Sequence, residues 1–343
     1  MEPEENPDSP AGNGRFARLR QWTAEALPAA MTDIEVASAD ASFRSYYRAR
    51  TAAASYIVMD APPSHEDCRP YVHVARLFRA AGANTPEVLA ENLAEGFLLL
   101  TDFGSTTYQA ALDEASADAL YRDANAALVK IQAASRAGEL PDYDAALLGR
   151  ELALFPDWYL GRHLAVELDA RRRGVLDQAF AAILANNLAQ PRVYVHRDWH
   201  CRNLMVTGAD NPGVLDFQDA VYGPVTYDLV SIYKDAYVAW EEERVLDWVI
   251  RYWEAARRAG LPVRPDFADF YRDFEWMGVQ RHLKVLGIFA RLYHRDGKAG
   301  YLDDMPRVLH YLRGACERYA ELRPLLGLLD EVAGKPAEVG YTF

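Results

Sequence analysis

The order of a strand, a loop and a hairpin between residues 193 and 217 restricts the fold of this chain more than any other stretch. Residues 193–195 form a short β-prone run that leads into the tripeptide His-Arg-Asp at 196–198. Two further β-prone runs, 204–206 and 213–215, are joined by residues rich in Gly, Asn, Asp and Pro, which is typical of a hairpin. Such a hairpin would bring the residues that flank it close together.

Three polar residues surround this hairpin in an order that indicates phosphoryl transfer. Asp198 ends the His-Arg-Asp tripeptide, Asn203 precedes the hairpin, and Asp216 follows it. Transfer from ATP needs a carboxylate that orients the acceptor hydroxyl and takes its proton, and a carboxamide and second carboxylate that hold magnesium. Asp198 fits the first role, and Asn203 and Asp216 fit the second because Mg²⁺ prefers hard oxygen ligands. The sequence therefore predicts an enzyme that uses ATP and Mg²⁺.

A second acidic tripeptide, Asp102-Phe103-Gly104, spells the magnesium motif of protein kinases literally. It lies upstream of Asp198, whereas the magnesium aspartate should lie downstream. We therefore interpret residues 102–104 as the end of a strand followed by a turn.

Composition narrows the classes of partner. The 343 residues carry a net charge of −13, and nucleic acid and anionic membranes both require a positively charged protein surface. The cysteines are odd in number, without metal-ligand spacing, and we expect buried thiols. No signal peptide and no apolar run of the roughly 18–20 residues that span a bilayer is evident. We expect a cytoplasmic protein with a small-molecule partner, neither nucleic acid nor membrane, and of unknown oligomeric state.

The chain divides into a tail and two lobes. Residues 1–14 are acidic and proline-rich, which predicts a disordered tail. Residues 15–103 predict a nucleotide-binding N-lobe, and residues 104–343 a mainly helical C-lobe that holds the catalytic loop and the substrate. The predicted N-lobe elements are helices at 15–27 and 69–81 and strands at 34–37, 45–49, 56–60, 88–91 and 96–101. The expected fold class is α+β, a two-lobed protein-kinase-like fold with a small antiparallel sheet.

The nucleotide side departs from the protein-kinase pattern. The turn between the first two strands, 38–44, contains no glycine, and no lysine precedes Lys130. Ser42 and Phe43 could present backbone groups to a phosphate. Arg44 or Arg48 could replace the missing strand lysine, because a guanidinium binds phosphate as a fork. The adenine should lie against the strand that contains Leu100, with Asp102 at the start of the hinge.

The motif set resembles the aminoglycoside phosphotransferase and choline kinase-like superfamily over roughly residues 30–320. The resemblance rests on the H-x-D-x-H-x-x-N form at 196–203, on Asp216, and on Tyr227-Asp228-Leu229. It implies a protein-kinase-like fold in which His196 and His200 organise the catalytic loop and Asp228 supports that loop from a helix start.

Four separated segments resemble a narrower group, the bacterial anomeric N-acetylmuramate/N-acetylglucosamine kinases of cell-wall recycling. They are residues 40–44, 59–63, 216–220 and 287–291. The resemblance implies phosphorylation of the C1 hydroxyl of the sugar.

The substrate lobe is dense in aromatic residues, of which most should be core and a few could face a sugar ring. Residues 276–292 predict an amphipathic helix that carries Arg281, His282 and Lys284, by default on a solvated face. In a cleft these three would favour an anionic substrate. Arg202 could bind the transferred phosphoryl group or pack on the surface of the loop.

Two alternatives stay open. One is another acceptor within the superfamily, such as an aminoglycoside, choline, homoserine or methylthioribose. The other is a nucleotide-binding pseudokinase, which the missing strand lysine suggests and the intact Asp198, Asn203 and Asp216 argue against.

Overall fold

The computed structural model describes residues 10–39 and 43–334. Contacts within the chain divide it into two compact units. The first unit contains residues 1–106 and 205–219, and the second contains residues 107–204 and 220–343. The first unit is discontinuous in sequence because the hairpin that follows the His-Arg-Asp loop belongs to it.

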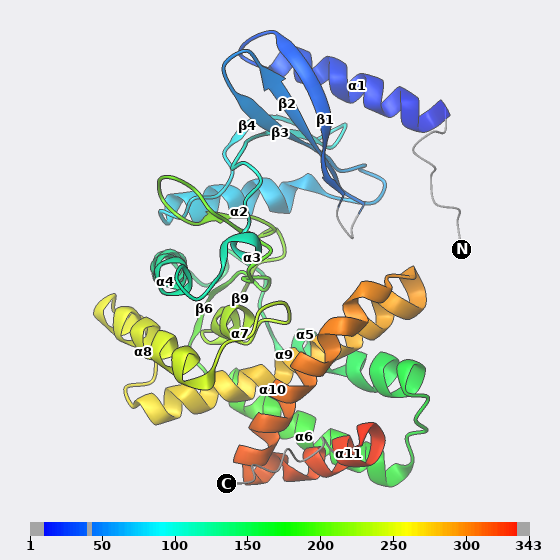
Figure 1. The fold of residues 1–343 in the computed structure, drawn as a ribbon, viewed down its shortest axis with the longest axis vertical. Coiled ribbons are helices and arrows are strands. Elements are labelled where there is room, and N and C mark those ends of the chain that lie inside the picture. Colours follow the sequence, from blue (N-terminus) through cyan, green and yellow to red (C-terminus); the bar gives the residue numbers. More distant parts are fainter. Residues whose placement is uncertain (1–9, 40–42, 335–343) are drawn as a thin grey trace. The chain divides into compact units, whose positions relative to one another are not determined.

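The first unit is built on a five-stranded antiparallel sheet with the order β1-β2-β3-β5-β4 (Figure 1). Its elements are α1 (Pro10–Ala26), β1 (Met31–Ala39), β2 (Ser45–Thr51), β3 (Ser55–Asp60), α2 (Cys68–Ala80), β4 (Val88–Asn92), β5 (Phe97–Thr101), and the short strand β8 (Gly213–Val214), which pairs with β7 (Leu204–Met205). The strands and α2 confirm the elements expected from the sequence. Helix α1 begins at Pro10, so the prediction of a disordered tail is wrong for residues 10–14. Proline is compatible with the first turn of a helix. Residues 1–9 lie outside the described part.

One face of the sheet is closed by α1. Leu19 of this helix is fully buried with Val58 of β3 and with Phe97 and Leu99 of β5. Phe97 and Leu99 share a face because side chains alternate along a strand. Leu98 and Leu100, which point to the other face, are buried as well, so β5 is covered on both sides.

The second unit is mainly helical, and its other helices pack around one long helix, α9 (Phe267–Asp296) (Figure 1). The remaining elements are α3 (Tyr108–Ala111), α4 (Ala117–Ala133), α5 (Ala145–Leu154), the π-helix η1 (Phe155–His163), α6 (Ala170–Leu188), β6 (Arg192–Val195), β9 (Val221–Pro224), α7 (Tyr227–Tyr233), α8 (Glu242–Arg258), the 3₁₀ helices η2 (Ala299–Asp304) and η3 (Ala320–Leu322), α10 (Met305–Arg318) and α11 (Arg323–Ala333). Within the described residues, none of the helices combines the length and the apolar character needed to cross a bilayer.

Helix α9 is buried over most of its length, from Phe270 to Ala290. It approaches α5 at Gly287, where an added Cβ would lie 2.5 Å from the carbonyl carbon and oxygen of Leu154. Only a residue without a side chain permits that approach. The helix therefore crosses the centre of the second unit, and its charged residues have to be accommodated inside.

Candidate active site

The His-Arg-Asp loop, residues 196–203, follows directly after β6 in the second unit. Strand β6 pairs antiparallel with β9, so that Val195 lies opposite Val221. Both strands are largely buried. The pair supplies a rigid base from which the loop extends, with Asp198 three residues beyond the strand end.

The loop backbone is held in an uncommon conformation at Arg197, whose φ of 77° lies in the left-handed region. The carboxylate of Asp228, on α7, accepts hydrogen bonds from the N–H of His196 (2.7 Å) and from the N–H of Arg197 (3.0 Å). The carbonyl of Arg197 accepts a hydrogen bond from Nη1 of Arg281 (3.1 Å). The strained residue is thus held on one side by the Asp228 carboxyl, whose pKa burial raises to about 7, and on the other side by the guanidinium of Arg281.

Hydrogen bonds inside the loop fix the main chain of Asp198. Its N–H donates to Nδ1 of His196 (3.2 Å), and its carbonyl accepts from the N–H of His200 and from Nδ2 of Asn203, both at 3.0 Å. The Asn203 bond fixes the orientation of the carboxamide. Both histidines therefore lie among the groups that order the loop.

Asp198 lies in a positive electrostatic environment within the second unit. Burial by itself would raise the pKa of its carboxyl, but the charges of Lys284, His200 and Arg281 outweigh burial and hold that pKa well below the ordinary range. The carboxylate is therefore ionised at neutral pH and can accept a proton. Ionisation is one condition for a general base, and the low pKa means that the carboxylate depends on close positioning of an acidic acceptor hydroxyl.

Three charged or titratable residues of α9 are buried inside the second unit and do not lie on a solvated helix face. Arg281, His282 and Lys284 are buried, with exposed fractions of 6%, 2% and 7%, so the expectation of a solvated face is wrong. Nζ of Lys284 lies 3.0 Å from Oε1 of Glu151 and donates to the hydroxyl of Tyr227 at 3.0 Å. Nε2 of His282 lies 3.3 Å from the carbonyl of Lys234. Each of the three interacts with protein groups, and substrate binding by them stays a prediction.

Arg202, the other residue expected to contact the substrate, is exposed at the far end of the loop. Its Nε donates to Oε1 of Gln109 (3.0 Å), and its guanidinium lies 3.5 Å from the ring centroid of Tyr237. These contacts orient the side chain. They do not decide whether the guanidinium meets substrate.

In the first unit, Asp216 is a non-glycine residue with a φ of 59°, and its Oδ1 accepts a hydrogen bond from Nε2 of Gln218 (2.8 Å). The negative charge of Asp216 interacts with the guanidinium of Arg44. Burial alone would lower the pKa of the Arg44 guanidinium, but the neighbouring Tyr46, Glu66 and Asp216 raise it. Within the first unit, Asp216, which the sequence assigns to magnesium, and Arg44, which it assigns to phosphate, therefore interact electrostatically.

The remaining residues predicted to bind nucleotide have defined surroundings. Phe43 is exposed and stacks on His65 with a centroid separation of 4.4 Å. Leu100 is buried in β5 between β3 and β4. Ser42 lies outside the described residues.

Asp102 accepts hydrogen bonds from Nε of Arg48 (2.7 Å) and from the N–H of Gly104 (2.9 Å). Gly104 has a φ of 82° and β5 ends at Thr101. These contacts confirm the strand end and turn expected at residues 102–104.

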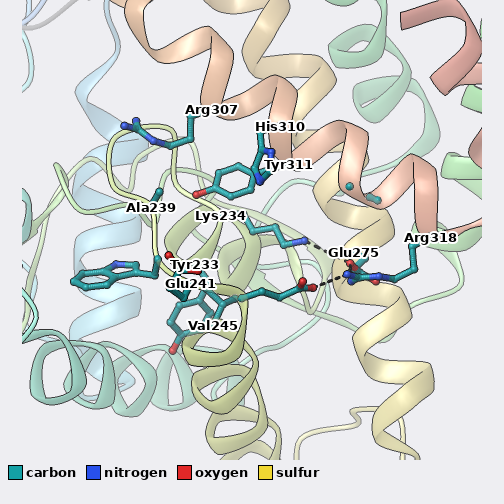
Figure 2. A pocket seen from close by; sticks show the side chains of 14 residues that line it. Tyr233, Lys234, Ala239, Glu241, Val245, Glu275, Arg307, His310, Tyr311 and Arg318 are labelled. Carbon is teal, nitrogen blue, oxygen red and sulfur yellow. Dashed lines mark hydrogen bonds and ion pairs between the residues drawn. The ribbon is translucent and has the colours of Figure 1, made fainter. Parts of the chain in front are cut away.

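A pocket of about 360 Å³ lies in the second unit between the end of α7, the start of α8, α9 and α10 (Figure 2). Lys234 and Arg318 point toward Glu275 on one side, while Trp240 and Tyr311 contribute aromatic surface. Pockets that hold small molecules have volumes of about 300–1,000 Å³. The pocket is thus large enough for a monosaccharide.

One wall of this pocket is tied to the His-Arg-Asp loop. Asp235, next to Lys234, accepts hydrogen bonds from the N–H of Cys201 and of Tyr237, both at 3.0 Å. The ring of Tyr237 in turn meets that of His200 at 5.5 Å. These contacts join the segment after α7 to the loop.

Sequence reasoning missed Glu151, a buried acid on α5. It accepts hydrogen bonds from Nη2 of Arg197 (2.6 Å) and from the hydroxyl of Tyr143. The sequence pattern that could have indicated this residue is its position on an otherwise apolar helix face, between Leu148 and Leu152, which are both fully buried. A lone acid on such a face indicates a buried ion pair.

Comparison with known proteins agrees with the geometry of the two units. Residues 33–265 match the model of the phosphotransferase enzyme family. An N-acetylmuramate/N-acetylglucosamine kinase of Neisseria meningitidis is 50% identical over 335 residues, which cover 96% of this chain and 99% of that protein. A protein of the same name from Pseudomonas aeruginosa is 49% identical over 92% of this chain and 96% of its own length.

Solved structures share the fold at low sequence identity. Choline kinase LicA from Streptococcus pneumoniae superposes with a TM-score of 0.63 at 13% identity, covering 87% of this chain and 99% of that one. Aminoglycoside phosphotransferase APH(2")-IIa, in a ternary complex with streptomycin and ATP, gives a TM-score of 0.56 at 13% identity over 86% and 96% of the two chains. The resemblance and the fold class inferred from the sequence are confirmed, and the chain belongs to the phosphotransferase enzyme family.

Proposed function

We propose that this protein transfers the γ-phosphoryl group of ATP to the anomeric hydroxyl of N-acetylmuramate and N-acetylglucosamine. The observation that carries the proposal is the 50% identity, over almost the whole of both chains, to a kinase named for these two sugars. The intact His-Arg-Asp loop supports turnover over the pseudokinase alternative. The cytoplasm, where ATP is present, is the compartment this activity requires.

The residues of the loop fit the role of base and support. Asp198 would accept the proton of the C1 hydroxyl while the C1 oxygen forms a bond to the γ-phosphorus and the bond to the leaving ADP oxygen breaks. An anomeric hydroxyl is more acidic than an ordinary alcohol, so an ionised carboxylate is a sufficient base when the groups are well positioned. Asp228, Asn203 and the two histidines would hold the loop in place through the hydrogen bonds described above.

The nucleotide is proposed to lie against the first unit. Leu100 and Asp102 lie at the strand end where the adenine is expected, and we assign Phe43 and Arg44 to the phosphates. Ser42 is assigned to the phosphates from the sequence alone, because it lies outside the described residues. Arg44 supports this assignment because it shares the electrostatic neighbourhood of Asp216 within the same unit.

Magnesium fits the donor chemistry of Asn203 and Asp216, a carboxamide and a carboxylate with hard oxygen atoms. The Asn203 amide nitrogen is directed to the Asp198 carbonyl at 3.0 Å, which sets the orientation of the amide oxygen. When bound, the ion would neutralise charge on the phosphates.

The test of the acceptor uses sugars in which the C1 oxygen is blocked. ADP release is measured with N-acetylmuramate, N-acetylglucosamine and their 1-O-methyl glycosides. We expect turnover with the free sugars and none with the methyl glycosides. Equal rates with the blocked sugars would assign another hydroxyl as acceptor. Turnover only with choline or aminoglycosides would move the protein to the alternative acceptors, and no turnover with any acceptor would favour a pseudokinase.

A further inference from the structure

A buried ionic cluster lies against the His-Arg-Asp loop in the second unit. Its three cations are Arg197 of the loop and Arg281 and Lys284 of α9, and its carboxylates are Glu151 of α5, Asp198 and Asp228. Arg281 and Lys284 are three residues apart and so project from one side of α9. The cluster joins the loop to α5, α7 and α9, which are distant in sequence.

Glu151 is the centre of the cluster. Its Oε1 lies 2.6 Å from Nη2 of Arg197 and 3.0 Å from Nζ of Lys284. Burial would raise the pKa of this carboxyl, but the two cations lower it, so Glu151 is ionised at neutral pH. Since it is only 5% exposed, removal of one partner would leave charge inside the protein without full compensation.

The cluster acts on the residue of the loop that is most strained. Arg197 has a positive φ, which is a strained conformation for a residue with a side chain. Its side chain is held by Glu151, its carbonyl by Arg281, and its N–H by Asp228. Asp198 is the next residue, so the direction of its carboxylate follows from the conformation that these three groups impose.

We propose that Glu151, Arg281 and Lys284 are positioning residues, which hold Arg197 in its left-handed conformation and thereby direct the carboxylate of Asp198. The proposal rests on the assignment of Asp198 as base in the proposed function. It gives the charged residues of α9 a role inside the protein, in place of contact with an anionic sugar. None of the three needs to touch substrate.

The experiment compares Lys284→Met, Lys284→Arg and the double variant Glu151→Gln/Lys284→Met with the wild-type enzyme. Lys284→Met should lower kcat by roughly 10- to 100-fold, because a small misplacement of a reacting group has a cost of this size. The KM values for ATP and sugar should stay within about threefold, since no binding contact is removed. Lys284→Arg should recover most of the lost kcat, because it restores a cation beside Glu151.

The double variant tests the role of Glu151 itself. It removes both charges of the pair and leaves the guanidinium of Arg197 without its carboxylate, so its melting temperature should lie below that of Lys284→Met and its kcat should be lower still. The matched control is Arg313→Met, which breaks another buried ion pair, to Asp330, away from the loop. Arg313→Met should lower the melting temperature and leave kcat at the wild-type value.

Three outcomes would overturn the inference. The first is a kcat within twofold of wild type in both Lys284→Met and the double variant, and the second is a loss of kcat in Arg313→Met equal to that in Lys284→Met. The third is a raised KM for the sugar with kcat retained in Lys284→Met, which would assign Lys284 to substrate binding. The same comparison is made on the slow hydrolysis of ATP without sugar. A failed sugar assay would then count against the proposed acceptor, and the ratios for hydrolysis would still decide this inference.

Discussion

The guanidinium of Arg44 forms an ion pair with Glu66, with 3.0 Å between Nη2 and Oε2, and both side chains are largely buried in the first unit. Glu66 lies two residues before the start of α2. The pair joins the turn before β2 to the start of this helix. In protein kinases a lysine and a glutamate make a comparable connection between a strand and a helix.

Arg44→Ala should raise the KM for ATP and lower kcat, because a cation near the proposed phosphate site is lost. Initial-rate measurements over a range of ATP concentrations would show both effects. Arg50→Ala, which removes an exposed arginine of β2 paired with Glu35, should behave as wild type. If Arg44→Ala and Arg50→Ala gave the same kinetics, Arg44 would be a structural residue only.

Asp198→Asn should lower kcat by about 10²–10⁴-fold while ADP still binds, because the variant removes the proton acceptor and keeps the shape of the side chain. Coupled ADP-release assays and calorimetric titration of ADP would measure the two properties. Asp177→Asn, at an exposed position of α6, is the control for loss of a carboxylate. Turnover near the wild-type rate would remove Asp198 from the role of base.

Asp216→Ala should weaken the binding of Mg·ATP as well as turnover, since it removes a proposed magnesium ligand. Nucleotide affinity is compared with and without added Mg²⁺. In the wild-type protein the ion should strengthen ATP binding, and in the variant this gain should be reduced. An unchanged gain would show that Asp216 does not bind the ion.

His282 should make stability depend on pH. Burial lowers the pKa of its imidazole to about 3, below the ordinary value of about 6.5. The unfolded chain therefore takes up a proton before the folded protein does, and stability is lost as pH falls from about 6.5 toward 3. His282→Asn should reduce the loss of unfolding free energy between pH 7.5 and 5.5 by about 1 kcal/mol.

Urea unfolding at the two pH values measures this effect. Tyr311→Leu, which removes the ring that stacks on His282 at 5.3 Å, should destabilise the protein equally at both pH values relative to wild type. The same pH dependence in His282→Asn and wild type would contradict the assignment.

Gly287→Ala should destabilise the protein by about 1–3 kcal/mol, because its Cβ would overlap the backbone of Leu154 at 2.5 Å. Gly327→Ala is the matched control on α11, where an added Cβ meets no atom within 4 Å. It should be neutral or slightly stabilising, since alanine favours a helix over glycine. Melting temperatures that changed equally in both variants would argue against the close approach of α9 and α5.

The strands and the hairpin could be predicted from the sequence because their information is local. Short β-prone runs separated by turn-forming residues indicate the strands β2, β3 and β5. The spacing of Asp198, Asn203 and Asp216 indicates the phosphoryl-transfer motif. The partners of Lys284 could not be predicted, because we expect a basic residue on a helix to be solvated unless the burial of the whole helix is known. Glu151 lies 133 positions from Lys284, and no local pattern relates the two.

The first unit has a consequence for how the protein acquires its structure during synthesis. Phe217 packs against Tyr71 and Phe78 of α2, with centroid separations of 4.7 and 6.2 Å, yet it is made more than a hundred residues after them. While the ribosome adds residues 107–204, the sheet and α2 exist without the segment that completes their core. A newly made N-terminal half therefore exposes an apolar surface until residue 219 has emerged, which makes this interval the time at which a chaperone would be needed most.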